Sequence, residues 1–510
     1  MSTPGTNTPF NIPVLLASVS VLFVVFKLWR VRVEMAKLDG VPTVGSTGFL
    51  GSLVSGMRFV KHAREIVNEG YEKYYGRPFK IRTSDHWIVV ISGPTLVNDI
   101  RKASDEYLSS NEAIGDALQF EYTLGKSQRE NDYHVGVVRN ALTKNISNRF
   151  DDIRNEMMTA FTDEVPVTDD WTTVNAYDTI AKIICKTTNR FLVGLPLCRD
   201  PDWIDLNIQF TIDVFARSSI INLFPDILKP IIGNLLSPKG AVLKRALPHI
   251  GHVIRERLDK EEQYGWDWED KPNDLISWLL DENPGGKYRA VEDITMRLLG
   301  INMAAIHTTA MVFSIVLSYL AIQPDSVIKA LREEIESVVE EHGWNKVSMG
   351  YLRKVDSFMK EAARMVGIAQ VNSDRKVLKD FTLSDGTRLP AGSFVSIPVS
   401  AMHHDQRYFK DPNEFKPFRF ADMRDSEENG HLKHQMSSLN SDYFFFGCGK
   451  HACPGRFLAV NELKTLVGHT LLTYDVKLQE FKKELPVFSS FGNAVVPNRK
   501  LKILFRKRKY

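Results

Sequence analysis

Cysteine is scarce in this chain. Only four cysteines occur among 510 residues. That number is too small for a disulfide framework and suits a reducing compartment. No two cysteines have the Cys-x-x-Cys spacing, so a structural zinc site of the finger type is excluded. The four cysteines are Cys185, Cys198, Cys448 and Cys453.

The sequence also has little net charge, no internal repeat and no low-complexity tract. Its formal charge of +3 is too small to indicate a nucleic-acid partner, and no basic-helix pattern is present. No flavin or dinucleotide fingerprint occurs, so electrons for any redox chemistry must come from another protein. Apolar residues make up 43% of the chain, which is ordinary for a globular protein and sufficient to enclose a cofactor.

An apolar run lies near the N-terminus. It extends from Ile12 to Phe26 and on to Trp29, close to the roughly 20 residues that a membrane-spanning helix needs. Basic residues follow the run, whereas Met1 to Phe10 contains no Lys or Arg, so the following domain is expected in the cytosol. A cleaved signal peptide would have the basic residues first and a small-residue cleavage site afterwards. The sequence therefore predicts an uncleaved anchor.

The domain organisation follows from this reading. We predict a membrane anchor at residues 1–30, a linker rich in Pro and Gly at 31–50, and one large domain at 51–510. Strand-like runs at 87–91 and 394–399 enclose a region that is mainly helical in its pattern. The expected fold class is thus mainly α with small β-sheets.

Two helices in this region have particular interest. A long apolar helix is expected from about Val291 to Ala321 with acidic residues in its first turn. Another is expected from about Met349, with Ser348 as its N-cap. Between residues 221 and 238 an apolar segment is interrupted by Pro and Gly. It has two interpretations, a buried broken helix or a second membrane contact.

The segment from Phe444 to Phe457 reads FFFGCGKHACPGRF. Glycines allow the backbone to turn tightly and to approach a flat object, and proline stiffens the path. Basic residues beside Cys453 favour the ionised thiol, which is the form that binds metal. The alternative for a lone cysteine is a small buried apolar residue in a turn.

This segment resembles the heme-thiolate loop of the cytochromes P-450, Phe-x-x-Gly-x-Arg-x-Cys-x-Gly. Phe446, Gly449, Cys453 and Gly455 match, and His451 replaces the usual arginine. The resemblance implies a cytochrome P-450 fold preceded by a single transmembrane helix. It also implies heme b as cofactor, with Cys453 as the axial iron ligand that favours O–O cleavage.

A second motif lies inside the long helix, where the sequence reads Ala304-Ala305-Ile306-His307-Thr308-Thr309. It resembles the oxygen groove of the same family, with Ala305 in place of glycine and His307 in place of an acid. Thr308 would hydrogen-bond dioxygen, although a threonine inside a helix can instead bond to the preceding turn. His307 would relay protons, or be a polar residue satisfied by its neighbours.

Three charged residues complete the resemblance. Glu361 and Arg364 form a Glu-x-x-Arg pair on one helix face, and Arg419 follows in a Phe-x-x-Phe-Arg-Phe context. In the family, these residues form a buried ion cluster that supports the cysteine side of the heme. They are therefore assigned a structural role.

The two heme propionates need donors. The resemblance points to His451, to Arg375, and to Arg139 in a segment where Val135 replaces the usual tryptophan. The alternative for Arg139 is a solvated helix arginine.

The implied activity is oxygen insertion into an apolar small molecule by a monooxygenase at the endoplasmic reticulum membrane, with its domain in the cytosol. Electrons would come from NADPH through a cytochrome reductase, with cytochrome b5 as a further partner. The wording of the motifs is most similar to fungal members that oxidise terpenoids, steroids or other secondary metabolites. A heme-thiolate isomerase or dehydratase and a non-catalytic heme sensor are the alternatives.

The choice between the two neighbouring cysteines is testable. Cys453→Ala is expected to abolish the red-shifted Soret band of the reduced carbon monoxide complex, because that band requires the thiolate ligand. Cys448→Ala is the matched control and is expected to retain the band. The opposite pattern in the absorption spectra would overturn the assignment.

Overall fold

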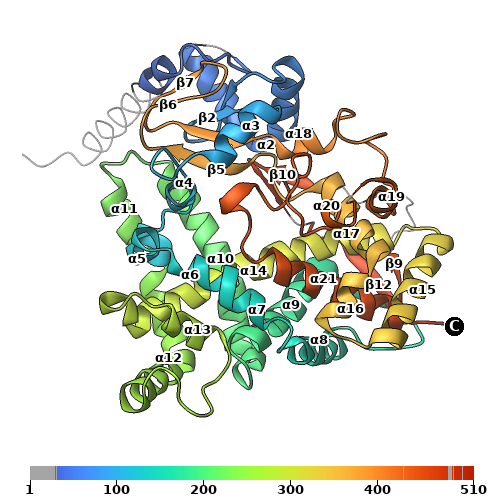
Figure 1. Cartoon of the computed structure of the whole chain (residues 1–510). Helices are drawn as coiled ribbons and strands as arrows, with labels where there is room; N and C mark the ends of the chain where they lie inside the picture. Colours follow the sequence, from blue (N-terminus) through green and yellow to red (C-terminus); the bar gives the residue numbers. More distant parts are fainter. Residues whose placement is uncertain are drawn as a thin grey trace, which may run out of the picture.

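The computed structural model describes residues 29, 32–46, 48–428, 430–479, 485, 488–496 and 498–509. The predicted anchor at 1–30 lies outside these residues, apart from Trp29. Helices dominate the described part and small sheets lie at its edges (Figure 1). The mainly α class with small β-sheets is therefore confirmed.

The helices vary from single turns to thirty residues. In chain order they are α2 Phe49–Lys73, α3 Pro94–Lys102, α4 Ser110–Leu118, α5 Lys126–Glu130, α6 Tyr133–Val137, α7 Thr143–Asn145, α8 Phe150–Glu164, α9 Ala176–Leu192, α10 Pro201–Asn222, α11 Lys229–Leu236, α12 Lys239–Tyr264, α13 Leu275–Asp281, α14 Val291–Leu320, α15 Asp325–His342, α16 Lys346–Tyr351, α17 Arg353–Val366, α18 Val399–His403, α19 Arg419–Ser426, α20 Gly430–Lys433 and α21 Arg456–Thr473.

The largest sheet has the order β1-β2-β8-β5-β3. Strands β2 and β8 are parallel, and the other neighbours in this sheet are antiparallel. A three-stranded sheet has the order β4-β12-β9, and two hairpins complete the set. The strands are β1 Phe79–Arg82, β2 Trp87–Val90, β3 Leu108–Ser109, β4 Thr172–Asn175, β5 Asn372–Val377, β6 Phe381–Thr382, β7 Arg388–Leu389, β8 Phe394–Ile397, β9 Tyr474–Leu478, β10 Ser489–Phe491, β11 Ala494–Val496 and β12 Lys502–Lys507.

Helix α14 runs through the middle of the helical part (Figure 1). It packs against α9, α10, α12, α17 and α21, and most of its residues are buried. Among the described residues it is the one helix long and apolar enough to cross a membrane, but 78% of its most apolar window is buried inside the protein. Its apolar composition therefore reflects a central position in the core.

Several expectations are confirmed and two are wrong. The long helix and the strands near 87–91 and 394–399 are present. Ser348 is not an N-cap: Asn345 caps α16, and Ser348 is the third helical residue of a reciprocal capping box. The helix expected from Met349 is divided at Leu352 into α16 and α17.

The apolar segment at 221–238 is broken, as one of its two interpretations expected, but most of it is not buried. It forms the end of α10 and the short helix α11, which lies at the left edge of the molecule (Figure 1). On α11 only Gly233 is buried, because its Cα packs against the ring of Tyr122 so closely that a Cβ would lie 2.5 Å from that ring. The opposite face of α11 carries exposed Ile231 and Leu235.

Candidate functional site: a cysteine at a helix N-terminus beneath α14

The segment that carries Cys453 is a tight loop leading into α21; we call residues 444–455 the cysteine loop. Gly447 and Gly449 have φ values of +75° and +63°, in the left-handed region that glycine adopts at little cost. The amide of Gly447 donates to the carbonyl of Phe444 at 2.8 Å, and the amide of Cys453 donates to the carbonyl of Phe446 at 2.8 Å. The loop therefore folds back on itself and presents the cysteine.

The sulfur of Cys453 lies just before the first turn of α21. The backbone amides of Gly455 and Arg456 hydrogen-bond to it and stabilise its ionised form, as does the Arg456 guanidinium. Burial acts in the opposite direction and is the larger effect, so the pKa of the Cys453 thiol is raised overall. A metal ion bound to this sulfur would favour its ionised form, because the thiolate is the form that binds metal.

The face of α14 at Ala304 and Thr308 is unlike the rest of that helix. Both residues are exposed, although the neighbouring Ile306, Thr309 and Ala310 are buried. The two exposed residues are four apart and share one helix face. An exposed patch in the middle of a buried helix lines an internal space, which is what a bound cofactor and substrate would need.

The hydroxyl of Thr308 donates to the carbonyl of Ala304 at 2.7 Å. This is the bond to the preceding turn that a threonine can form inside a helix. The oxygen atom keeps its capacity to accept a hydrogen bond from the space beside it.

His307 turns away from that face. Its Nδ1 lies 2.7 Å from the hydroxyl of Tyr177, and its Nε2 lies 3.0 Å from the carbonyl of Ile208. A carbonyl can only accept, so Nε2 carries the proton and Nδ1 accepts from the tyrosine. Burial lowers the pKa of His307, which favours this neutral form. Both ring nitrogens are thus engaged by α9 and α10.

Glu361, Arg364 and Arg419 meet in the interior; we call these three residues the brace. Arg364 makes two bonds to the Glu361 carboxylate, at 2.8 and 2.9 Å, and Arg419 Nε makes a third at 3.0 Å. Their side chains are at most 6% exposed. The remaining guanidinium hydrogens reach backbone carbonyls between residues 403 and 414.

The structure also offers a buried cation without a matching anion. Arg375 on β5 is 2% exposed, and its Nη1 donates to the carbonyl of Asp374 at 2.9 Å. Within the described residues, no carboxylate lies within ion-pair distance of its guanidinium, whose hydrogen-bond partner is that backbone carbonyl. Burial lowers its pKa, as expected for a charge that lacks a counterion. A carboxylate from a bound group, such as a heme propionate, fits this position.

The other two predicted propionate donors lie around the same loop. His451 Nε2 is 2.5 Å from a carboxylate oxygen of Asp105, which also pairs with Lys450 at 3.0 Å. Arg139 Nη2 donates to the carbonyl of Lys450 at 2.9 Å and its side chain is exposed. His451 therefore lies in the cysteine loop and Arg139 borders it, but each has a protein partner in this structure.

Sequence reasoning missed Asp105 and Tyr177. Asp105 follows α3 in a polar turn that has no motif, and Tyr177 is one of many aromatic residues in a helical pattern. Neither residue had a local signal, because each acquires its role from a partner more than one hundred residues away.

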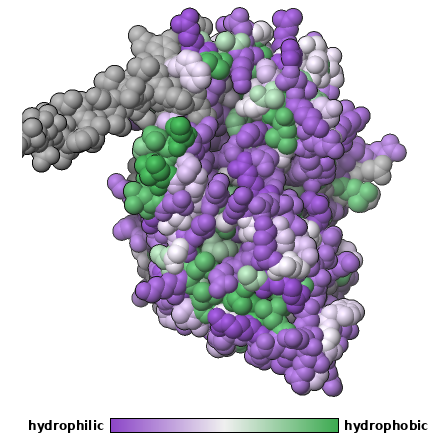
Figure 2. Space-filling view, turned by 90° about the vertical axis from the view of Figure 1, so that its left-hand side faces the viewer, coloured by the Kyte–Doolittle hydropathy of each residue, from purple (hydrophilic) through white to green (hydrophobic). Residues whose placement is uncertain are grey.

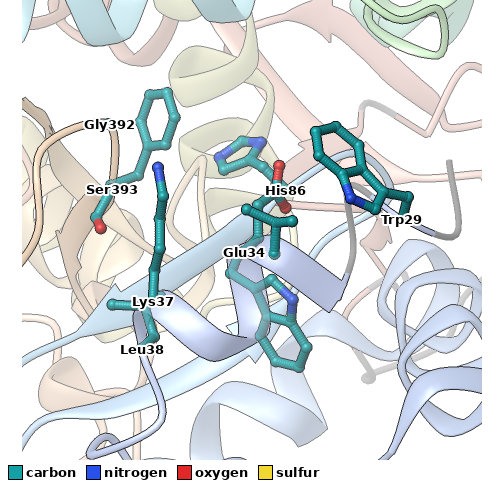
Figure 3. Close-up of a pocket in the computed structure, with 10 residues that line it drawn as sticks. Trp29, Glu34, Lys37, Leu38, His86, Gly392 and Ser393 are labelled. Atoms are coloured by element: carbon teal, nitrogen blue, oxygen red, sulfur yellow. The ribbon is translucent and has the colours of Figure 1, made fainter. Parts of the chain in front are cut away.

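A separate cavity of about 240 Å³ lies between Trp29, residues 33–38 and the large sheet (Figure 3). Trp29 and Lys37 face His86 and Ser393 across it. None of the predicted site residues lines this cavity, so it is distinct from the site around Cys453.

The cysteine at a helix N-terminus, the exposed α14 face and the unpaired buried cation are together the parts of a heme-thiolate protein. Comparison with known proteins agrees. Residues 47–505 match the family model described as Cytochrome P450. The chain is 38% identical over 473 residues to cytochrome P450 monooxygenase 151 of Postia placenta, covering 92% of this chain and 94% of that protein.

Two further relatives show the same relationship. Cytochrome P450 monooxygenase 71 of Postia placenta is 38% identical over 464 residues, which is 90% of this chain and 92% of the relative. Cytochrome P450 monooxygenase CYP512U6 of Ganoderma lucidum is 34% identical over 458 residues, 89% of each protein. This chain belongs to the cytochrome P450 family and is a heme-thiolate monooxygenase, with heme iron held by a cysteine thiolate. The isomerase and sensor alternatives are not favoured.

The brace makes a testable prediction. Arg364→Ala leaves the Glu361 carboxylate partly unpaired in the interior, so the free energy of unfolding is expected to fall by about 3–5 kcal/mol. Arg353→Ala is the matched control, because Arg353 pairs with Asp425 at the surface and such pairs contribute at most about 1 kcal/mol. Urea unfolding followed by circular dichroism measures both losses, and equal losses would contradict the structural role of the brace.

Proposed function

We propose that this protein is a membrane-bound monooxygenase that oxidises an apolar small molecule, with O2 as oxidant and NADPH as electron source through a separate reductase. One oxygen atom enters the substrate and the other leaves as water, with two electrons from NADPH and two protons. The observation that carries this proposal is the exposed Ala304 and Thr308 face on an otherwise buried α14. Such a face gives a substrate room beside the cofactor, which a monooxygenase needs.

The residues around the cofactor have separate proposed roles. Cys453 supplies the thiolate, which Gly455 and Arg456 stabilise through their amides. Heme with a thiolate ligand supplies the capacity to cleave the O–O bond. Phe446 fixes the cysteine backbone through its carbonyl. Arg375 binds a propionate inside the protein.

His451 and Arg139 are proposed to bind propionate at the rim. In that role His451 would donate a hydrogen bond to the propionate as well as to the Asp105 carboxylate.

Thr308 and His307 are proposed to have different roles, and only Thr308 is proposed to transfer protons. The Thr308 hydroxyl borders the exposed face of α14 and can accept and pass a proton there. His307 is held on both nitrogens by Tyr177 and by the Ile208 carbonyl. Of its two possible roles, these bonds support that of a residue that fixes α14 to α9 and α10. We therefore assign proton delivery to Thr308.

Substrate class rests on the relatives and on the surroundings of the site. The similar proteins named above come from fungi. Val366 at the end of α17 and Ile368 just after it are partly buried apolar residues. A terpenoid, a steroid or another fungal secondary metabolite is the proposed substrate. The endoplasmic reticulum membrane is the proposed location, and cytochrome b5 is a proposed second electron donor.

Microsomes carrying this protein and a reductase provide the test of function. Incubation with a terpenoid and steroid panel is expected to give a product that requires NADPH and contains one atom from isotopically labelled O2, read by mass spectrometry. Thr308→Ala is expected to lower product per NADPH consumed by about tenfold or more, because the proton donor is lost. Product formation without NADPH would instead favour an isomerase or dehydratase.

His307→Ala is the matched variant on the same helix. It is expected to retain the ratio of product to NADPH and to lower thermal stability, because only its bonds to α9 and α10 are lost. Loss of that ratio at constant stability would restore His307 as a proton relay.

An apolar face on α11 supports contact with the membrane. Ile231 and Leu235 on α11 are 66% and 77% exposed, and Ile227, two residues before the helix, is 79% exposed. Phe215 in α10 and Leu223 just after it are also exposed. Figure 2 views the molecule from this side and shows apolar residues gathered in patches among polar ones. Apolar residues clustered in this way mark an interaction surface.

The membrane contact is tested on a form that begins at residue 32 and so lacks the predicted spanning segment. Ile231→Asp combined with Leu235→Asp is expected to weaken binding to phosphatidylcholine vesicles by about tenfold or more, because each buried apolar side chain contributes about 1.5–3 kcal/mol. Val347→Asp is the control, since Val347 is 65% exposed on α16. Equal sedimentation of all three proteins with vesicles would contradict a contact through α11.

A further inference from the structure

His403, the last residue of α18, touches both the brace and the cysteine loop. It is 1% exposed. Its backbone carbonyl accepts a hydrogen bond from Arg364 Nη1 at 2.5 Å. Its ring Nε2 accepts one from the amide of Phe444 at 3.2 Å. One buried residue thus connects the ion cluster to the first residue of the loop that carries the cysteine.

The ring of His403 is held in one state and one orientation. Because Nε2 accepts from an amide, the proton is on Nδ1 and the imidazole is neutral. Burial and the nearby Arg364 lower the pKa of His403 well below its usual range, with smaller effects from His404 and then Lys360. The ring stacks on Tyr443 at a centroid distance of 4.8 Å and an angle of 11°. Packing therefore keeps the acceptor nitrogen aimed at the loop.

Phe444 is held at several points. Its carbonyl accepts from the amide of Gly447 at 2.8 Å and from Asn372 Nδ2 at 2.5 Å. Two residues later, the carbonyl of Phe446 accepts from the amide of Cys453. The backbone of Phe444 is thus linked to that of Cys453 by a short hydrogen-bonded path, so the position of one fixes the position of the other. A displacement at the His403 contact would displace the sulfur.

We infer that His403 is a positioning residue for Cys453: its backbone is fixed by the brace, and its ring fixes the start of the cysteine loop. The brace therefore acts on the thiolate through one imidazole as well as through general packing. The spectral consequence rests on the proposed role of Cys453 as iron ligand, whereas the hydrogen-bond consequence does not.

Two variants at this position separate the acceptor from the packing. His403→Phe keeps an aromatic ring to stack on Tyr443 but has no acceptor. His403→Gln has an amide oxygen at a similar distance from the backbone and can accept the Phe444 amide. In His403→Phe, hydrogen exchange in the peptide at residues 443–446 is expected to be roughly tenfold faster, because one buried hydrogen bond is lost. His403→Gln is expected to exchange like the unchanged protein.

The same variants are compared in the spectrum of the reduced carbon monoxide complex. The fraction with the red-shifted Soret band is expected to fall in His403→Phe and to be retained in His403→Gln. His404→Phe is the control, because His404 bonds to Arg64 and to the Ser400 carbonyl and not to the loop. That variant is expected to leave the exchange and the spectrum unchanged.

Three results would overturn the inference. One is unchanged exchange at residues 443–446 in His403→Phe. Another is faster exchange in His403→Gln than in the unchanged protein, a comparison that does not require the phenylalanine variant to fold. The third is the same change in His404→Phe. If Cys453 were not the iron ligand, Cys453→Ala would retain the red-shifted band, and the exchange measurements would still test the hydrogen bond.

Discussion

The charge cluster of Glu361, Arg364 and Arg419 is the constraint on which the rest of the site depends. Two guanidinium groups and one carboxylate are withdrawn from water, so each hydrogen and each lone pair needs a protein partner. The backbone of residues 403–414 supplies the carbonyls that Arg364 and Arg419 require. The irregular path of the chain there is therefore set by the need to satisfy buried charge.

The path of the chain from residue 403 to 414 also affects the position of Cys453. The segment that supplies carbonyls to the brace begins at His403, whose ring accepts the amide of Phe444. The loop then turns at two glycines and places Cys453 just before the first turn of α21, where backbone amides hydrogen-bond to the sulfur. Helix α14, which carries Thr308, is held in place by its burial and by the bonds of His307 to α9 and α10. The positions of Cys453 and of α14 thus depend on long-range contacts more than on the loop itself.

Much of this arrangement could be predicted from residue patterns. The thirty-residue α14 follows from its length and apolar composition, and α17 brings Glu361 and Arg364 to one face because they are three residues apart. The N-cap of α16 was predicted wrongly, because Ser348 and Asn345 both have side chains that can cap a helix, and the backbone angles select Asn345. The exposure of α11 could not be read from its apolar sequence, which is equally compatible with burial.

By itself, the sequence determined the family and the order of the motifs, and it singled out Cys453 and Thr308 as the proposed site residues, since these depend on residue type and local spacing. Only the tertiary structure decided which side chains meet. It gave His307 two partners on other helices, paired His451 with Asp105, left Arg375 buried without a protein carboxylate among the described residues, and placed His403 between Arg364 and Phe444. The physical reason is that hydrogen bonds and ion pairs between distant segments depend on how helices pack, and no local pattern encodes that packing.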